Sequence, residues 1–436
     1  IPSGATINNQ GTATNFGATG SASWTTTVKT GDFTAVAGEG YFVDTSSGEI
    51  DVTLPAGTAG AVIAIADYAK NFATNNCILV QNGSDKIGGS TNNAKLNTNG
   101  IAVTLIFIDS TKGWIVTDDG NQSSADTNPF VQATGGTVTT SGNDKIHTFT
   151  GPGIFCVSSA ATCAANNVVS YLVVAGGGAG GPNQGPVGTA TGGGGGAGGF
   201  RELKSPTTPY TASPLDGYPS APNRVTITAT AFPITVGAGG ALAGAHPTAS
   251  PGGSGGVSTF STITSAGGGG GGNDRVNGTA GGSGGGRGGE ANPGPGAAGN
   301  TPPTTPAQGN DGGAGGYSAP AYGAGGGGGA TGAGGNGSTG DSGDGGTGAT
   351  SEITASPVAY AGGGGGGGYG PGQAFGTQGG GNGTRSPSAS CGAAVATSGT
   401  TNTGGGGGGG GQNPASGGRE GATGGSGIVI IRYKFQ

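Results

Sequence analysis

The sequence has no methionine, two histidines and four cysteines, and charged residues make up only 8% of its 436 positions. The net charge is −6 and the 15 basic residues form no patch, so nucleic acid is not an expected partner, because phosphate contacts need clustered Lys and Arg. No apolar run reaches the length of a membrane-spanning helix, and no signal peptide is evident. Because the chain starts at Ile1 and lacks methionine, we expect a processed product or the ordered part of a longer polypeptide.

The sequence contains few residues that could bind a metal ion or form a disulfide. The four cysteines are Cys77, Cys156, Cys163 and Cys391, and none forms a CxxC pair. A structural zinc site needs four well-spaced ligands, so we expect no metal and no other cofactor. Cys156 and Cys163 flank a short Ser/Ala/Thr loop and are candidates for a disulfide. The alternative is two small buried thiols on adjacent strands.

Groups that could carry catalysis are isolated from one another. GxGxxG occurs many times but never in a βαβ context, and no GKS or GKT is present, so nucleotide sites are not indicated. His147 and His246 have no evident nucleophile partner. Asp341, Asp344 and Glu352 lie in or near a Gly/Ser loop without apolar walls that would shift a pKa, so turn-forming acids are favoured over a glycosidase pair. We expect no enzymatic activity and no catalytic residue.

Glycine is the residue that the sequence has in abundance, at 111 positions, and proline adds another 24. This composition approaches that of disordered or fibrous chains, but the low charge meets only half of the usual disorder signature. Strand-like segments enter the glycine-rich region at 171–175 and leave it at 428–433. The near-pure runs between them are Gly192 to Gly199, Gly267 to Gly272, Gly281 to Gly289, Gly325 to Gly329, Gly362 to Gly368 and Gly404 to Gly411.

Runs of this kind are compatible with three structures. Collagen needs glycine at every third residue, a period that these runs do not keep. A flexible linker is the plainest alternative, although a linker requires neither framing strands nor recurring runs of similar length. Extended helices of the polyproline II type fit both features, because all-glycine helices approach closely enough to bond their outward N–H and C=O groups to one another. We therefore expect a polyglycine II lattice, in which an interior Gly→Val substitution is especially damaging.

The first part of the chain has the chemistry of strands and turns. Residues 1–30 are rich in Thr, Asn and Gly and are interpreted as a β-rich shaft or connector. Residues 31–119 alternate Val-, Ile- and aromatic-rich segments with Gly, Asn, Asp or Pro, which predicts a small β-sandwich or β-prism-like domain. The expected strands are 33–37, 41–44, 50–54, 62–67, 77–81, 102–108 and 114–117. Essentially no α-helix is expected.

The rest of the chain is predicted to form one further domain after a linker at 120–135. This glycine-rich domain covers residues 136–436, with a boundary near Val131. Its entry strands are expected within 136–175, its lattice and loops within 176–427 and its closing strand at 428–435. Segments 224–228 and 232–236 are predicted to pair as two strands across a short turn. The expected fold is therefore mainly β plus polyglycine II-type helices, as a glycine-rich sandwich framed by strands.

Segments at both borders of the glycine-rich region resemble a known family. YLVVAGGGAGG, GGGGGAGGFRE, ITVGAGG and GGSGIVIIRY are similar to the glycine-rich domain of bacteriophage tail-fibre and adhesin proteins. IPSGATINNQGTATNFG and DFTAVAGEGYFVD resemble modules of structural appendage proteins of tailed phages, particularly marine ones. The resemblance covers most of the chain. It implies a sandwich of glycine helices whose connecting loops carry receptor specificity, here within 292–322, 341–360 and 369–403.

Aromatic residues stand out in these loops, because this half of the chain otherwise has few large side chains. The candidates for receptor contact are Tyr317, Tyr322, Tyr360, Tyr369 and Phe375. Exposed tyrosines on a rigid frame supply contact area at low entropic cost. In the alternative interpretation each ring caps the end of a glycine helix and shields the lattice from water. The sequence does not separate the two roles.

The function expected from these features is that of a virion appendage, a tail fibre or adhesin located on the extracellular particle. Its expected partners are a host-cell surface protein or glycan and other virion proteins, and a homotrimer is expected for at least the N-terminal part. We expect no nucleic-acid partner and no membrane insertion. Two alternatives remain open: a purely structural fibre or capsid or tail decoration protein without a receptor role, and a polysaccharide depolymerase.

Overall fold

The computed structural model describes residues 22–121, 130–183, 190–243, 250–274, 276–289, 294–316, 322–339, 341–369, 372–384, 394–413, 417–418 and 420–436. The chain forms two compact units, unit 1 (Ile1–Thr127) and unit 2 (Asn128–Gln436). Across the described ranges the structure consists of β-sheets and extended segments, with no α-helix and two short 3₁₀ turns, η2 (Ala164–Asn167) and η3 (Ala221–Asn223). The predicted mainly β fold class is confirmed. None of the described helices is long and apolar enough to cross a membrane.

Unit 1 is a sandwich of two sheets. The first has the order β1 (Ser23–Trp24), β3 (Glu39–Val43), β5 (Val62–Asp67), β8 (Ile101–Phe107) and β9 (Trp114–Asn121). The second has the order β2 (Phe33–Thr34), β4 (Ile50–Thr53), β6 (Cys77–Val80) and β7 (Ala94–Leu96). Successive strands from β2 to β6 alternate between the sheets, so the neighbours β3 and β5, like β4 and β6, run parallel.

In unit 1, β4, β6 and β8 alternate buried and more exposed residues, whereas β5 is buried along its whole length. Inward residues of both sheets form one apolar core around the fully buried Trp114. Asp67 is also fully buried, and its carboxylate accepts the backbone N–H groups of Asn71, Phe72 and Gly100, so the charge is compensated by hydrogen bonds. The segment expected to be a shaft instead contributes β1 to the first sheet. Residues 1–21 lie outside the described part.

Two five-stranded sheets form the base of unit 2. The outer sheet has the order β10 (Gln132–Thr134), β13 (Gly153–Ser159), β16 (Ala231–Thr235), β17 (Ser258–Phe260) and β18 (Ile263–Ser265). The inner sheet has the order β11 (Thr137–Ser141), β12 (Asp144–Phe149), β23 (Ile428–Lys434), β14 (Ser170–Val174) and β15 (Phe200–Leu203). The C-terminal strand β23 is therefore central, and it pairs antiparallel with both β12 and β14.

In the inner sheet, β14 and β23 are buried on both faces, which explains their continuous apolar sequences, whereas the edge strand β11 is largely exposed. One face packs against the outer sheet around Phe155, Tyr171 and Phe260. The other face packs against alanines that adjoin separate glycine runs, Ala197, Ala330 and Ala361, and against the hairpin β19 (Ala349–Ser351)–β20 (Val358–Tyr360). Strands buried on both sides have no polar face and read as unbroken hydrophobic segments.

Two sequence-based expectations need correction in this base. Residues 224–228 do not pair with 232–236: Thr226 forms a single bridge with Val168, while β16 pairs with β13 and β17. Cys156 and Cys163 are free thiols, and both are exposed rather than buried. Cys156 lies on the outward side of β13, whose inward positions are Phe155 and Val157, and Cys163 precedes the 3₁₀ turn η2.

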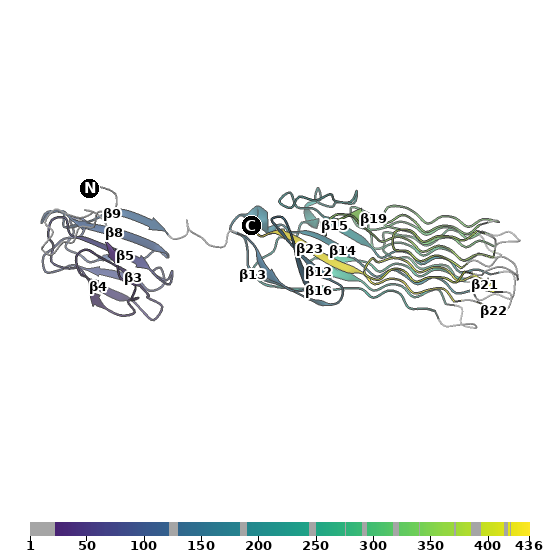
Figure 1. Cartoon of the computed structure of the whole chain (residues 1–436), viewed down its shortest axis with the longest axis horizontal. Coiled ribbons are helices and arrows are strands. Elements are labelled where there is room, and N and C mark those ends of the chain that lie inside the picture. The colour runs from purple at the N-terminus through teal and green to yellow at the C-terminus, as the bar shows by residue number, and fades with distance from the viewer. Residues whose placement is uncertain are drawn as a thin grey trace, which may run out of the picture. The chain divides into compact units, whose positions relative to one another are not determined.

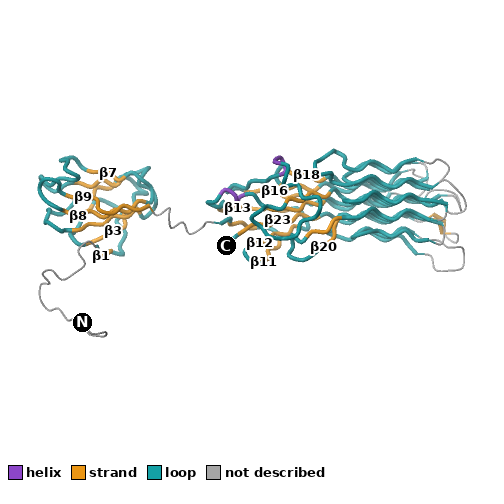
Figure 2. The backbone as a smooth tube through the Cα atoms, turned by 90° about the horizontal axis from the view of Figure 1, so that it is seen from above, coloured by secondary structure: helices purple, strands orange, loops and turns teal. Residues whose placement is uncertain are grey.

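Beyond the inner sheet the chain forms a lattice of extended glycine-rich runs that lie side by side (Figures 1 and 2). In the run 191–199, consecutive N–H groups donate to different neighbours in a repeating order of three. Gly192, Gly195 and Gly198 donate to Gly410, Gly407 and Gly404; Gly193, Gly196 and Gly199 donate to Gly272, Gly269 and Ala266; Gly194 and Ala197 donate to Gly325 and Gly328. Three residues per turn is the repeat of polyglycine II.

The carbonyl groups of the same run follow the same period toward other neighbours. They accept N–H groups from the runs 175–181, 364–367 and 283–286. This run therefore gives its N–H groups to three neighbours and its C=O groups to three others, so the interior is filled by backbone. A side chain does not fit there: a Cβ on Gly195 would lie 2.1 Å from the carbonyl oxygen of Gly178.

Short polar side chains complete the hydrogen bonds at the perimeter of the lattice. The backbone N–H groups of Gly299, Ala314, Phe375 and Gly376 have no outer run to bond, and each donates to a side-chain oxygen. The acceptors are Asp311 at 2.8 Å, Asn336 at 2.9 Å, Asp344 at 2.7 Å and Asn382 at 3.0 Å. Asn and Asp thus replace the missing backbone partner and satisfy the outermost layer.

Candidate functional site

The described runs of the lattice pass alternately away from and back toward the inner sheet, so the ends of these runs gather at two opposite edges (Figure 2). We call the edge beside β14, β15 and β23 the base edge, marked by Ala175, Gly199 and Gly427. The opposite edge is the far edge, marked by Thr191, Gly289 and Gly411. The bridge between Thr191 and Gly289 and the bond from Gly192 to Gly410 place these residues at one level.

Two candidate tyrosines, Tyr322 and Tyr369, lie at the same level of the far edge, on neighbouring runs. Their runs are antiparallel neighbours, because Ala324 donates to Gly367 at 3.1 Å and Gly327 donates to Gly364 at 2.8 Å. Two residues further out, this register brings Tyr322 level with Tyr369. Both are half-buried, and the carbonyl of Tyr322 accepts the Thr191 hydroxyl.

A third run adds polar groups to the same place. Ser342 donates its hydroxyl to the Gly367 carbonyl at 2.8 Å, and the exposed Asp341 precedes it. The Asp341 carboxylate also lies beside the next run, because a Cβ on Gly372 would lie 2.0 Å from its Oδ1. The far edge therefore joins two tyrosines, a carboxylate and a hydroxyl from segments that are distant in sequence.

Tyr360, grouped with these residues from the sequence, lies at the opposite edge. It ends β20 at the base edge, is 3% exposed and packs in the apolar cluster with Leu172, Phe200 and Ile428. Burial raises the pKa of its hydroxyl to about 12. Tyr360 therefore caps the lattice, which is the alternative role considered for these rings.

The remaining candidates are separate from both groups. Phe375 is 56% exposed on the flank of the lattice, where its carbonyl accepts Gly345 N–H. Tyr317 lies outside the described residues. Each of the three expected recognition loops includes at least one complete run of the lattice. Each therefore contributes residues to more than one part of the lattice and does not form a single surface loop.

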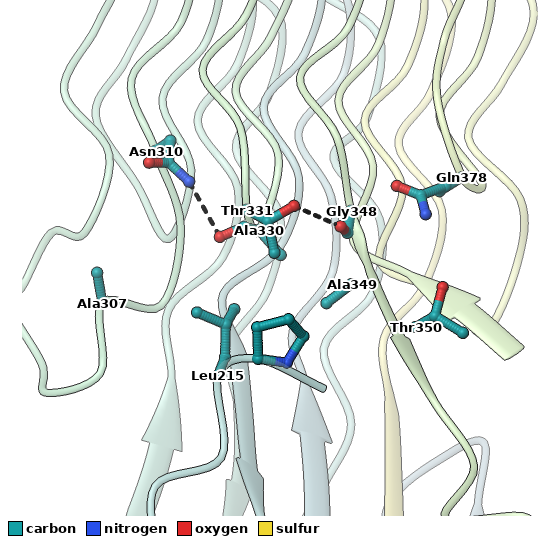
Figure 3. A pocket seen from close by; sticks show the side chains of 10 residues that line it. Leu215, Ala307, Asn310, Ala330, Thr331, Gly348, Ala349, Thr350 and Gln378 are labelled. Atoms are coloured by element: carbon teal, nitrogen blue, oxygen red, sulfur yellow. Dashed lines mark hydrogen bonds between the residues drawn. The ribbon is translucent and has the colours of Figure 1, made fainter. Parts of the chain in front are cut away.

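A pocket of about 520 Å³ opens at the base edge (Figure 3). Leu215 and Ala307 form part of its apolar wall, and no charged side chain lines it. Its polar groups serve the fold: the Asn310 amide donates to the Ala330 carbonyl at 3.0 Å and the Thr331 hydroxyl to the Gly348 carbonyl at 2.7 Å. The pocket thus offers few unengaged polar groups to a ligand.

Below this pocket a buried polar network ties the long segment 204–216 to the inner sheet. Glu202 accepts Ser213 N–H at 2.8 Å and the Ser351 hydroxyl, and burial raises the pKa of its carboxyl. Arg432 pairs with the buried Asp144 at 2.8 Å and donates to the carbonyls of Pro209 and Ile353. Glu202, Asp144 and Arg432 are buried, and each is engaged by structural partners.

The ionisable residues considered for catalysis do not converge. Asp341 is at the far edge, Asp344 accepts Phe375 N–H one helical turn away, and Glu352 accepts Thr211 N–H at the base edge. His147 is buried between the Gly135 carbonyl and the Tyr433 hydroxyl, and His246 is not among the described residues. Within the ranges that the structure covers, no three His, Cys, Asp or Glu side chains are grouped as metal ligands.

The lattice is filled by backbone and framed by β-sheets, so the protein is of the class that is built on a glycine-rich domain. The glycine-rich domain family matches residues 150–434, and the chain belongs to that family. The match begins just before β13 and ends within β23, so it includes nearly all of unit 2 and none of unit 1. No curated protein matches the chain.

Proposed function

We propose that this chain is a bacteriophage virion appendage, a tail fibre or adhesin that binds a host-surface protein or glycan through the far edge of its lattice. One observation carries the proposal: described runs from distant parts of the sequence end on one edge of a frame held by backbone hydrogen bonds. Side chains at that edge are not required by the interior. They are therefore open to change without loss of the fold, which suits receptor recognition.

The chemistry of the far edge supports contact with a polar surface. Tyr322 and Tyr369 supply aromatic area with a hydroxyl, and Asp341 and Ser342 supply hydrogen-bonding groups beside them. Each residue follows or precedes a backbone-bonded run, so little conformational freedom would be lost on binding. The resemblance to phage adhesins agrees with this arrangement.

The test is adsorption of the labelled full-length chain to a panel of bacterial strains. For a strain that binds the wild type, the double variant Tyr322→Ala/Tyr369→Ala is expected to lose at least tenfold in affinity, because two aromatic contacts of about 1 kcal/mol or more disappear. Phe375→Ala is the matched control, since it removes an exposed ring from the flank of the lattice. Both variants should retain the thermal unfolding midpoint of the wild type.

Equal loss of binding in the flank variant and the far-edge variant would contradict recognition at the far edge. A chain that binds no strain yet assembles onto particles would favour the purely structural alternative. Release of reducing ends from host polysaccharide would favour the depolymerase. Assembly with other virion proteins and a homotrimeric N-terminal part belong to the same proposal, and light scattering of the purified full chain tests the oligomeric state.

A further inference from the structure

Unit 1 carries an exposed tryptophan beside a hollow on its first sheet. Trp24 on the edge strand β1 is 43% exposed, whereas the other tryptophan, Trp114, is fully buried. Next to Trp24 is a pocket of about 340 Å³, lined also by Ala64, Ala102, Thr104, Asp118 and Gly120. The outward face of this sheet is thus hollowed at one place.

The strand register explains the hollow. One row across the sheet reads Trp24, Gly40, Ala64, Thr104 and Asp118. The next row reads Phe42, Ala66, Ala102 and Gly120. Both rows have an aromatic ring at one end and small residues in the middle, while the row beyond Ala64 has Val62, Ile106 and Ile115. Small side chains between larger ones leave a groove.

The aromatic end of the groove is held in place before any ligand binds. The Phe42 ring lies 4.9 Å from the Trp24 ring at a tilt of 33°, so Phe42 packs against the indole and supports it. The indole covers Gly40 so closely that a Cβ there would lie 2.7 Å from it. Gly40 is therefore the residue that lets the ring lie flat on the sheet.

We propose that this groove is a binding site for a neutral oligosaccharide. Apolar faces of sugar rings pack on aromatic rings that also have polar surroundings, and sugar hydroxyls hydrogen-bond to carboxylates and hydroxyls such as those of Asp118 and Thr104. No cationic side chain lines the groove, which disfavours acidic sugars. Among the described residues, Trp24 is the one aromatic side chain that lines the groove, so its rings do not surround a ligand as an aromatic cage would, which disfavours a cationic ligand. The site lies in unit 1 and is independent of the far edge in unit 2.

Tryptophan fluorescence of the full-length chain tests the proposal. Acrylamide should quench Trp24 but not the buried Trp114, and neutral trisaccharides of glucose, galactose and mannose are the probes. We expect at least one to protect Trp24 saturably, and charged trisaccharides of uronic acids to give no protection. Wild-type emission from Trp114 in every variant verifies that unit 1 is folded.

Calorimetry with the protecting trisaccharide measures binding directly. Variants of the groove residues then show how much the ring, the carboxylate and the floor of the groove each contribute. Trp24→Ala should abolish binding, Asp118→Asn should weaken it about tenfold, and Ala102→Leu should block the groove while leaving the ring. Gly40→Ala should weaken binding by displacing the indole. Tyr68→Ala, which removes another exposed ring of unit 1, is the control and should bind as the wild type does.

Several results would overturn the proposal. The first is no protection by any neutral trisaccharide, and the second is equal binding by the wild type and Trp24→Ala. Protection by lysine or choline at low salt, and not by sugars, would assign the groove to a cation. Failure of acrylamide to reach Trp24 without ligand would show that the chain itself or a second copy covers the ring. None of these results depends on whether the far edge binds a host.

Discussion

At the scale of single residues, the lattice depends on the absence of a Cβ atom in glycine. At interior positions such as Gly195, Gly285 and Gly407, a Cβ would lie only 2.0 to 2.1 Å from a neighbouring carbonyl oxygen, far inside the van der Waals contact distance. The few larger residues inside, such as Ala179 and Ala197, stand where the packing leaves a methyl-sized space. Each interior glycine is therefore required for the close approach of neighbouring runs.

The first prediction concerns Gly195 in the central run. Gly195→Ala is expected to lower the free energy of unfolding of unit 2 by about 3 kcal/mol or more, because overpacking against the Gly178 carbonyl forces two runs apart. Gly151→Ala is the matched control in the same unit, since nothing lies within 4 Å of its Cβ position. Thermal unfolding followed by circular dichroism compares them, and equal midpoints would contradict a backbone-filled interior.

The second prediction concerns His147, whose burial lowers the pKa of its imidazole below the ordinary value of 6.5. The unfolded chain therefore takes up a proton at a higher pH than the folded one. Stability contributed by neutral His147 is present above about pH 6.5 and is lost as the pH falls toward the folded pKa, by up to about 1.4 kcal/mol per pH unit. His147→Gln should lack this loss.

The measurement for His147 is the free energy of unfolding between pH 7.5 and 5 in both proteins, analysed as their difference. The raised pKa of Glu202 acts with the opposite sign, since its ionised form destabilises the fold as the pH rises, but it is common to both proteins. An unchanged difference across this range would mean that His147 does not titrate differently in the two states.

At the scale of elements, strands were predictable from the sequence and lattice neighbours were not. Segments 62–67, 171–175 and 428–433 carry the Val- and Ile-rich patterns that strands need, and all three are central strands. Glycine runs have no side chains to distinguish one from another, so nothing local indicates which runs touch. The sequence does not show in which direction each run passes through the lattice. It therefore groups Tyr360 with Tyr322 and Tyr369, although Tyr360 lies at the base edge.

Perimeter runs provide the third prediction. Asn382→Ala removes the side-chain acceptor of Gly376 N–H, and the run 372–376 has no further backbone neighbour to replace it. We expect a loss of about 1 kcal/mol in stability and faster hydrogen exchange at Gly376, whereas the amide of Gly195 in the interior keeps its protection. Asn402→Ala, which leaves the acceptor of Gly376 intact, is the control. Equal exchange rates at Gly376 in all three proteins would contradict the role given to Asn382.

At the scale of the whole molecule, the two units have interiors of different chemistry. Unit 1 buries apolar side chains in a conventional sandwich core, whereas much of unit 2 buries peptide groups. Exposure of apolar surface raises the heat capacity on unfolding and exposure of polar surface lowers it. Per residue, the two units should therefore respond differently to temperature.

The fourth prediction follows for calorimetry of the full chain. Unfolding of unit 2 should show a heat-capacity change per residue clearly below the usual value of about 12–15 cal/mol/K, and unit 1 should lie near it. Trp24 and Trp114 are the only tryptophans and both belong to unit 1, so tryptophan emission identifies its transition. A usual value for unit 2 would contradict an interior filled with backbone.

The repeating order of three in the run 191–199 also limits how the length of this chain can change during evolution. Because each residue turns the helix by a third of a revolution, an insertion or deletion of one or two residues inside a run redirects every later N–H group to the wrong neighbour. A change of three residues adds or removes a full turn and preserves all directions. Related chains should therefore differ inside their runs in steps of three residues.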